Sequence, residues 1–171
     1  MIKTVDRSEF TLEQMRAAED MLLNLEQIYY SLTKLSREYT ATVRISGPDG
    51  YPDHSSECTG ISKQCNMSAE QTLGRLDELK KRYDALSDML LTLKSDLLQI
   101  RGTRIYKLLY LRFKLGYSAQ ETAQKMGASL RNYYRIRKAA LLPVCQSLNK
   151  TELGRRVLAS GSKVAIHKYF K

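Results

Sequence analysis

Between Ile105 and Leu142 the chain reads IYKLLYLRFKLGYSAQETAQKMGASLRNYYRIRKAALL, in which glycines and serines mark the boundaries of three short helices. The first helix is expected to begin near Ile105 and to end at Gly116, a residue type that favours the left-handed backbone after a helix. Ser118 suits the N-cap of a second helix, because Glu121 three residues later completes a capping box. Such short connections are typical of helices that pack on one another.

The second helix is expected over residues 119–126 and the third over about 130–142. Gly127 closes the second helix, and Ser129 caps the third. Helices joined by a few residues that include glycine form the helix-turn-helix arrangement, whose last helix enters the major groove of DNA. The sequence therefore predicts a helix-turn-helix within residues 102–148.

The third helix divides into an apolar and a basic face. Tyr133, Ile136 and Ala140 recur at helical spacing and are expected to pack inward with Leu141. Arginine can pair with guanine and asparagine with adenine in the major groove, whereas Tyr134 either contacts a thymine methyl or sugar or flanks the core. The residues expected to contact bases are Arg131, Asn132, Tyr134 and Arg135.

A second group of side chains is suited to phosphate, because its members lie beside helix N-termini or carry an ammonium group. These residues are Ser118, Gln120, Lys125, Ser129 and Lys138. The ordinary alternative is a charged face that is merely solvated. Solvated faces usually mix both signs of charge, and the absence of acids here favours a nucleic-acid contact.

The charge of the chain is divided unevenly along its length. The net charge is +10, but from Arg101 onward sixteen Lys and Arg residues face only two acids, Glu121 and Glu152, for a charge of +14. The first hundred residues carry −4. This division predicts a basic half that binds a polyanion and a nearly neutral half with another role. Residues 149–171 are expected to be a basic tail.

Two stretches of the first hundred residues carry a heptad repeat, with apolar positions spaced alternately three and four apart. We expect one helix over Thr11–Tyr39, with Thr11 as its N-cap, and a second after Ser68, the expected cap. Turn-forming residues between 40 and 67 indicate a flexible loop, so that residues 1–101 can fold back as an antiparallel hairpin. The repeat positions are Met15, Ala18, Leu22, Leu25, Tyr29, Leu32, Ser36 and Tyr39, then Leu76, Leu79, Tyr83, Leu86, Leu90, Leu93, Leu97 and Ile100.

Further apolar residues lie outside this repeat, and they predict self-association through the coiled coil, such as a four-helix bundle across a dimer. Alternatively, they pack on the rest of the same chain. The predicted fold class is all-α, an N-terminal antiparallel coiled-coil helical hairpin followed by a C-terminal helix-turn-helix. The residues outside the repeat are Leu23, Ile28, Leu35, Met89 and Leu98.

The predicted helix-turn-helix also resembles a known family. The residues that resemble the fourth region of bacterial sigma factors are LLYLRF (108–113), Gly116, Ser118, ETA (121–123) and MGAS (126–129). YYRIRKAAL (133–141) is similar to phage proteins of the ArpU and RinA type. The sigma region recognises the promoter −35 element, and the phage proteins regulate late, packaging or lysis genes. Thr122 departs from the usual isoleucine, and no other sigma region is recognisable.

The resemblance implies a sequence-specific transcription regulator of phage or prophage origin, with double-stranded DNA as partner and RNA polymerase as a further one. Two other interpretations stay open. One is a DNA-packaging component resembling a small terminase subunit, and the other is a protein–protein adaptor, such as a polymerase-binding or anti-repressor protein.

Catalysis is not expected, because no nucleophile–base pair, phosphate-binding glycine loop or carboxylate cluster is found. No cofactor is expected, and we expect no metal, since His54, Cys58 and Cys65 lack a Cys-x-x-Cys spacing and an obvious fourth ligand. The chain contains no apolar run of membrane-spanning length and no apolar signal segment. We therefore expect no membrane contact and a place in the cytoplasm of the host bacterial cell.

Overall fold

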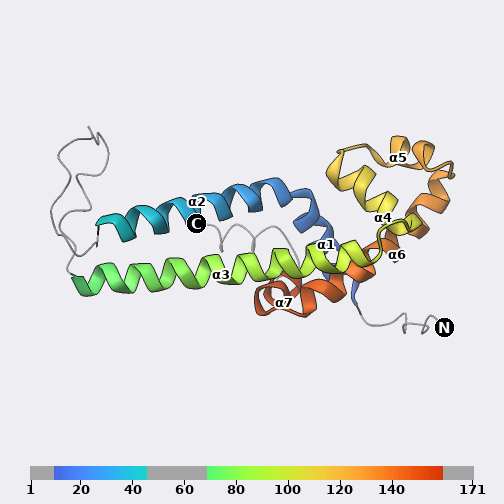
Figure 1. The fold of residues 1–171 in the computed structure, drawn as a ribbon. Coiled ribbons are helices and arrows are strands. Elements are labelled where there is room, and N and C mark those ends of the chain that lie inside the picture. Colours follow the sequence, from blue (N-terminus) through green and yellow to red (C-terminus); the bar gives the residue numbers. More distant parts are fainter. Residues whose placement is uncertain (1–9, 46–68, 160–171) are drawn as a thin grey trace.

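The computed structural model describes residues 10–45 and 69–159, and all regular structure in these residues is helical (Figure 1). The all-α fold class is therefore confirmed. The elements are α1 (Leu12–Leu23), α2 (Leu25–Ile45), α3 (Ala69–Gln99), α4 (Arg104–Leu109), the π-helical turn η1 (Tyr110–Lys114), α5 (Ala119–Lys125), α6 (Leu130–Asn149) and α7 (Glu152–Ala159).

Helices α2 and α3 lie side by side in opposite directions and form an elongated arm (Figure 1). The buried face of α3 follows the expected repeat, with Leu79, Leu86 and Leu93 at most 4% exposed. An ion pair between Arg75 and Glu38, 2.6 Å long, joins the two helices. The expected N-cap of α3, Ser68, lies outside the described residues, as does most of the loop expected between 40 and 67. The start of that loop is wrong, because residues 40–45 are helical and end α2.

The single helix expected over Thr11–Tyr39 is wrong, because the chain forms two helices that meet at Asn24. Thr11 caps α1 as expected and forms a capping box with Gln14. The Asn24 side chain donates a hydrogen bond to the Asp20 carbonyl, at 2.6 Å, and helps to end α1. Helix α1 packs on α6 and α7, whereas α2 packs on α3, so the chain must turn between them.

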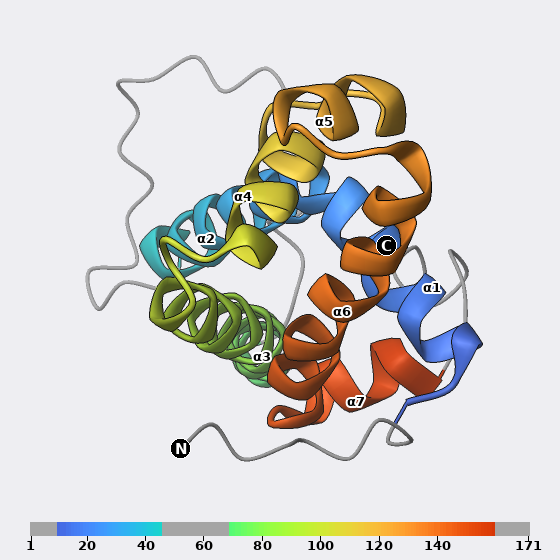
Figure 2. The same cartoon turned by 90° about the vertical axis from the view of Figure 1, so that its right-hand side faces the viewer.

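One core crosses the boundary that the sequence suggested between residues 101 and 102. Helix α6 lies in its middle and packs against α1, α3, α4, α5 and α7 (Figure 2). Met21 of α1, Leu86 of α3 and Leu148 of α6 belong to this same cluster and are at most 1% exposed. The arm and the C-terminal helices are therefore held together by shared apolar burial.

Helix α6 is longer than expected, because it continues through Pro143 to Asn149. A proline inside a helix costs about 3 kcal/mol, since it removes one hydrogen bond and crowds the preceding turn. The residues beyond it, Val144 and Leu148, are almost completely buried, and each such side chain stabilises the fold by about 1.5–3 kcal/mol. Burial therefore offsets the cost of the proline.

Residues 152–159 form α7 where a basic tail was expected, and Leu153, Val157 and Leu158 are buried. The Thr151 hydroxyl accepts a hydrogen bond from the Gly154 N–H at 3.1 Å and so begins the helix. Residues 160–171 of the expected tail lie outside the described part of the chain.

The apolar residues outside the heptad repeat differ in burial, and Leu35 is half-buried against the chain's own core. Ile28 and Met89 are 1% exposed and belong to the chain's own core, so the interpretation of these two as surplus surface is wrong. The break at Asn24 helps to explain this, because it ends the straight helix from which that surplus was inferred. Leu23 and Leu98 are about half exposed, at 52% and 48%.

None of the helices in residues 10–45 and 69–159 has both the length and the apolar character required to cross a membrane.

Candidate nucleic-acid interface

The candidate interface is built on α4, α5 and α6, whose boundaries are set by local capping. Gly116 and Gly127 have φ values of +72° and +61°, which residues with a Cβ rarely adopt. The backbone N–H of Ser118 donates to Glu121 Oε2 at 2.8 Å, and the Glu121 N–H donates to Ser118 Oγ at 3.2 Å. These glycine and capping features lie where the sequence predicted them.

The first helix of the predicted helix-turn-helix was expected to be α-helical as far as Gly116. Its second half, Tyr110–Lys114, is π-helical instead. The Leu115 N–H donates to the Tyr110 carbonyl five residues earlier, and the Tyr117 N–H reaches the Leu111 carbonyl. Arg112 donates to the Tyr117 carbonyl at 2.7 Å and reinforces the turn into α5. Capping residues and glycines give no signal for this widened turn.

The inner face of α6 is fixed by burial. Tyr133 and Ala140 are at most 1% exposed, and Ile136 is half-buried against the same core. Burial raises the pKa of the Tyr133 hydroxyl above its ordinary value. The Tyr134 ring meets the Tyr133 ring edge-on, with centroids 5.2 Å apart, and remains 51% exposed. These contacts determine which side of α6 faces solvent.

The outer face of the first half of α6 carries the residues predicted to contact bases. Arg131 and Arg135 are exposed, and Asn132 is half-buried. Arg135 Nη2 donates a hydrogen bond to Asn132 Oδ1 at 3.1 Å, so these two side chains are already associated. A bidentate contact to adenine uses both the oxygen and the nitrogen of an asparagine amide. Asn132 Oδ1 has a second lone pair and its amide nitrogen is not used by Arg135, so Arg135 can hold the amide in place during such a contact.

The residues predicted to contact phosphate come from the two capped N-termini and from nearby lysines. Ser118 and Ser129 use their hydroxyl oxygens to accept hydrogen bonds from the Glu121 and Asn132 N–H groups, which leaves each hydroxyl hydrogen free to be donated. Gln120 and Lys138 are exposed. The Lys125 ammonium lies 4.6 Å from the centroid of the Tyr117 ring, so part of its role is a cation–π contact.

Arg137 has a structural role that sequence reasoning missed. Its Nε donates to Glu19 Oε1 at 2.9 Å, and its Nη2 pairs with the other carboxylate oxygen. The hydrogen bonds that Arg137 donates to this carboxylate raise the pKa of Arg137. Glu19 lies on α1 and is 118 residues away, so no local pattern links the two. The pair fixes α6 to α1, so the charge of Arg137 is engaged within the fold.

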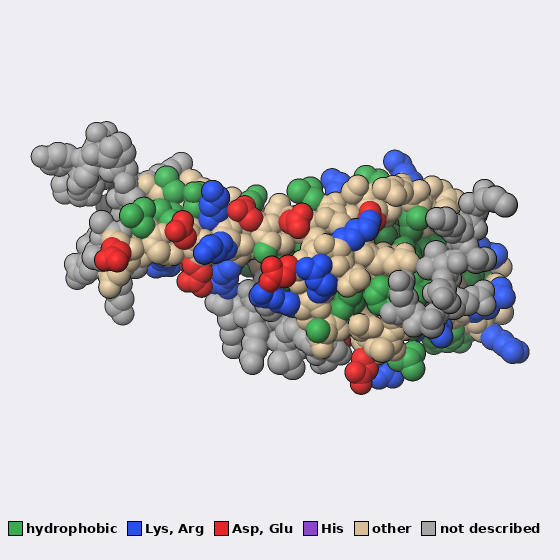
Figure 3. All heavy atoms as spheres, turned by 90° about the horizontal axis from the view of Figure 1, so that it is seen from below, with side chains coloured by type: hydrophobic (Ala, Val, Ile, Leu, Met, Phe, Trp, Pro, Cys, Tyr) green, Lys and Arg blue, Asp and Glu red, His purple; other side chains and the backbone are tan. Residues whose placement is uncertain are grey.

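The charges around this interface are predominantly of one sign. Between residues 104 and 149 the chain contains one acid, Glu121, whose carboxylate accepts hydrogen bonds from Ser118 that lower its pKa. Acidic and basic side chains are instead interspersed along the arm (Figure 3).

No cluster of metal-ligating residues occurs among the described residues, and His54, Cys58 and Cys65 lie outside them.

Comparison of the chain with protein-family models, with curated proteins and with solved structures finds no match. The resemblance to sigma region four and to the ArpU and RinA proteins therefore stays a prediction that rests on the quoted residues.

Proposed function

We propose that this chain is a sequence-specific DNA-binding transcription regulator that contacts the major groove with the first half of α6. In this proposal α5 and α6 form the helix-turn-helix, and α2 and α3 form the coiled-coil hairpin. One observation carries the proposal. Arg131, Arg135 and Lys138 are exposed along one side of a capped helix that contains no acid, while its opposite side is buried in the core.

Charge supports a polyanionic partner. Residues 101–149 carry ten Lys and Arg residues and one acid. If about six of them neutralise phosphates, affinity should fall by roughly three decades between 50 and 200 mM salt, because bound counterions are released. Arginine forks are suited to guanine edges and provide the discrimination between bases, whereas lysine contacts to phosphate position the helix.

The arm provides the second half of the proposal, which is self-association or a contact to RNA polymerase. For a two-fold dimer, the half-sites would lie about 34 Å apart or at a multiple of that distance. As part of this proposal, we expect the protein to act in the cytoplasm of a bacterial host.

The test begins with selection of bound fragments from the source genome, followed by fluorescence anisotropy on the selected site and on random DNA. Arg131→Ala and Arg135→Ala are each expected to cost about 1–3 kcal/mol on the selected site and much less on random DNA. Lys138→Ala should weaken both equally. Arg37→Ala, which removes an exposed arginine from α2, is the matched control and should change neither.

Equal losses on both DNAs for the two arginine variants would contradict base readout by α6. Failure of the wild-type chain to bind any DNA at low salt would contradict the whole proposal and favour the adaptor interpretation. Size-exclusion chromatography with light scattering tests the packaging interpretation, for which a ring of many subunits is expected.

A further inference from the structure

One side of α3 carries eight residues at a regular spacing that the chain's own fold does not use. They follow one another three and four positions apart, so they lie along one side of the helix. Leu73 and Leu91 are 63% and 62% exposed, and all the others are exposed except the half-buried Ser87. We call this set the outer stripe: Glu70, Leu73, Asp77, Lys80, Asp84, Ser87, Leu91 and Lys94.

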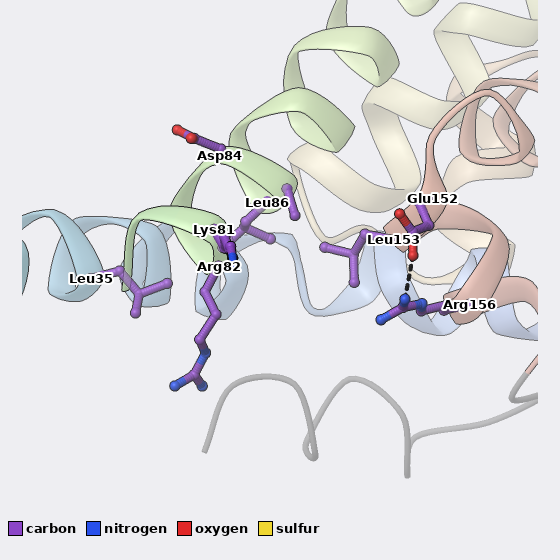
Figure 4. A pocket seen from close by; sticks show the side chains of 9 residues that line it. Leu35, Lys81, Arg82, Asp84, Leu86, Glu152, Leu153 and Arg156 are labelled. Atoms are coloured by element: carbon purple, nitrogen blue, oxygen red, sulfur yellow. Dashed lines mark hydrogen bonds and ion pairs between the residues drawn. The ribbon is translucent and has the colours of Figure 1, made fainter. Parts of the chain in front are cut away.

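The outer stripe flanks the face that α3 buries: from Asp77 to Lys94 it follows the buried repeat by one residue, or about 100° around the helix. Leu79, Leu86 and Leu93 point into the core. A groove of about 510 Å³ between α2, α3 and α7 is lined on the α3 side by residues that include Leu86 and, at its edge, Asp84 of the stripe. Asp84 is directed away from Leu86 and Leu153 (Figure 4). None of the five charged side chains of the stripe forms an ion pair with another residue in the described part of the chain.

The order of residues along the outer stripe is self-complementary. Positions equally distant from its midpoint, residue 82, carry matching chemistry. Lys80 mirrors Asp84, Leu73 mirrors Leu91, and Glu70 mirrors Lys94. The remaining pair, Asp77 and Ser87, matches a carboxylate with a hydroxyl that can donate to it.

We propose that the outer stripe is a self-association surface, on which α3 of a second copy packs antiparallel about a two-fold axis at residue 82. Leu73 then meets Leu91 of the second copy, and Lys80 meets Asp84 of the second copy. The two-fold repeats each contact, which gives two leucine layers and four ion pairs, two of them between Glu70 and Lys94. The long lysine stems cross the helix pair while their ammonium groups stay in water.

Charge also selects the orientation. A parallel pair in register would place each of the five charged residues opposite its own copy, and such like-charge contacts oppose association. The antiparallel pair has no like-charge contact at any of the eight positions. The heptad spacing agrees with this orientation. The stripe consists of two series with a seven-residue period, one starting at Glu70 and the other at Leu73. In an antiparallel pair centred on residue 82, each residue of one series meets a residue of the other series, as in antiparallel coiled coils.

The surface is small and largely polar, so the dimer should be weak and reversible. Two leucine layers and four solvent-exposed ion pairs suggest a dissociation constant on the order of micromolar, rising with salt as the ion pairs are screened. This inference extends the self-association part of the proposed function. It can fail or hold independently of DNA binding, because its test contains no DNA.

The test is sedimentation equilibrium of the full chain at low salt, over about 1–300 µM. Lys80→Asp faces Asp84 of the second copy with a like charge and should raise the dissociation constant at least about tenfold. Adding Asp84→Lys restores opposite charges and should return it to within about threefold of wild type. Lys34→Asp makes the same charge change on exposed α2 and should leave it unchanged. Thermal unfolding followed by circular dichroism checks that every variant is folded.

A wild-type chain that is monomeric throughout this range overturns the inference. So does a dimer that Lys80→Asp weakens no more than Lys34→Asp, or one that the double exchange fails to restore. These measurements can show that the outer stripe does not mediate dimerisation while anisotropy still shows site-specific DNA binding. In that case the proposed DNA-binding function stands, and the chain uses another self-association surface or none.

Discussion

Gly154 provides a sharp test of how α7 is held against the end of α6. A Cβ added at this glycine would lie 2.7 Å from both the Leu148 carbonyl carbon and Thr151 Oγ1, and closer still to the Leu148 carbonyl oxygen. That oxygen belongs to the backbone and accepts the Thr151 N–H at 3.3 Å, so it cannot rotate away as a flexible side chain would. Gly154→Ala therefore requires the two helices to separate.

The size of the effect follows from that separation. Carbon atoms in contact prefer about 3.5–4.0 Å, so α7 must move by roughly 0.8 Å or more. This movement loosens the packing of Leu153, Val157 and Leu158, all of which are at most 7% exposed. Forcing extra atoms into a packed core costs about 1–3 kcal/mol, and we expect about 3 kcal/mol because the obstructing group is backbone.

The measurement is urea unfolding followed by circular dichroism, with Gly74→Ala as the matched control. Gly74 lies in α3 with nothing within 4 Å of an added Cβ, so alanine there should stabilise the helix by about 0.8–1 kcal/mol. The two variants add the same methyl group, and their free energies of unfolding should differ by about 4 kcal/mol. If Gly154→Ala were as stable as wild type, the close approach of α7 to Leu148 would be refuted.

Three further predictions concern stability. Thr122→Val removes a completely buried hydroxyl that has no hydrogen-bond partner in the described structure, and calorimetry should show a gain of about 1 kcal/mol; a loss would reveal a hidden partner. Glu19→Gln leaves Arg137 without its carboxylate partner and should lower the free energy of unfolding in urea by about 1–2 kcal/mol, a modest value because the arginine is partly exposed. An unchanged free energy of unfolding would mean that the pair does not fix α6 to α1. The lowered pKa of Glu121 means that its stabilising effect is complete above the carboxyl's unfolded pKa and is lost as pH falls through the folded value. Glu121→Gln should thus reduce the fall of the melting temperature at acid pH, and an unchanged fall would count against the capping role.

Boundaries that depend on nearby residues could be predicted from the sequence. Gly116, Ser118, Gly127 and Ser129 have the backbone angles and capping hydrogen bonds expected of them, because a positive φ or a cap is decided within about four residues. The periodicity of α6 likewise predicted that Tyr133 is buried.

Features that depend on distant contacts could not be predicted in this way. Pro143 normally ends a helix, and only burial beyond it against other helices shows why α6 continues. The heptad repeat runs evenly past Asn24, whereas the break there follows from α1 packing on α6 and α7. In the candidate site, periodicity indicated the outer face of α6, but the partner of Arg137 is too remote in sequence to be inferred. DNA binding itself stays a proposal.

The continuity of α6 has a mechanical consequence. Every residue from Leu130 to Asn149 is helical, and α1, α3 and α7 pack against this helix. If the first half of α6 lies in a DNA groove, the arm of α2 and α3 therefore projects from the duplex in one fixed direction. Moving the binding site by half a helical turn, about 5 base pairs, would then swing the arm to the opposite side, and a whole turn would bring it back.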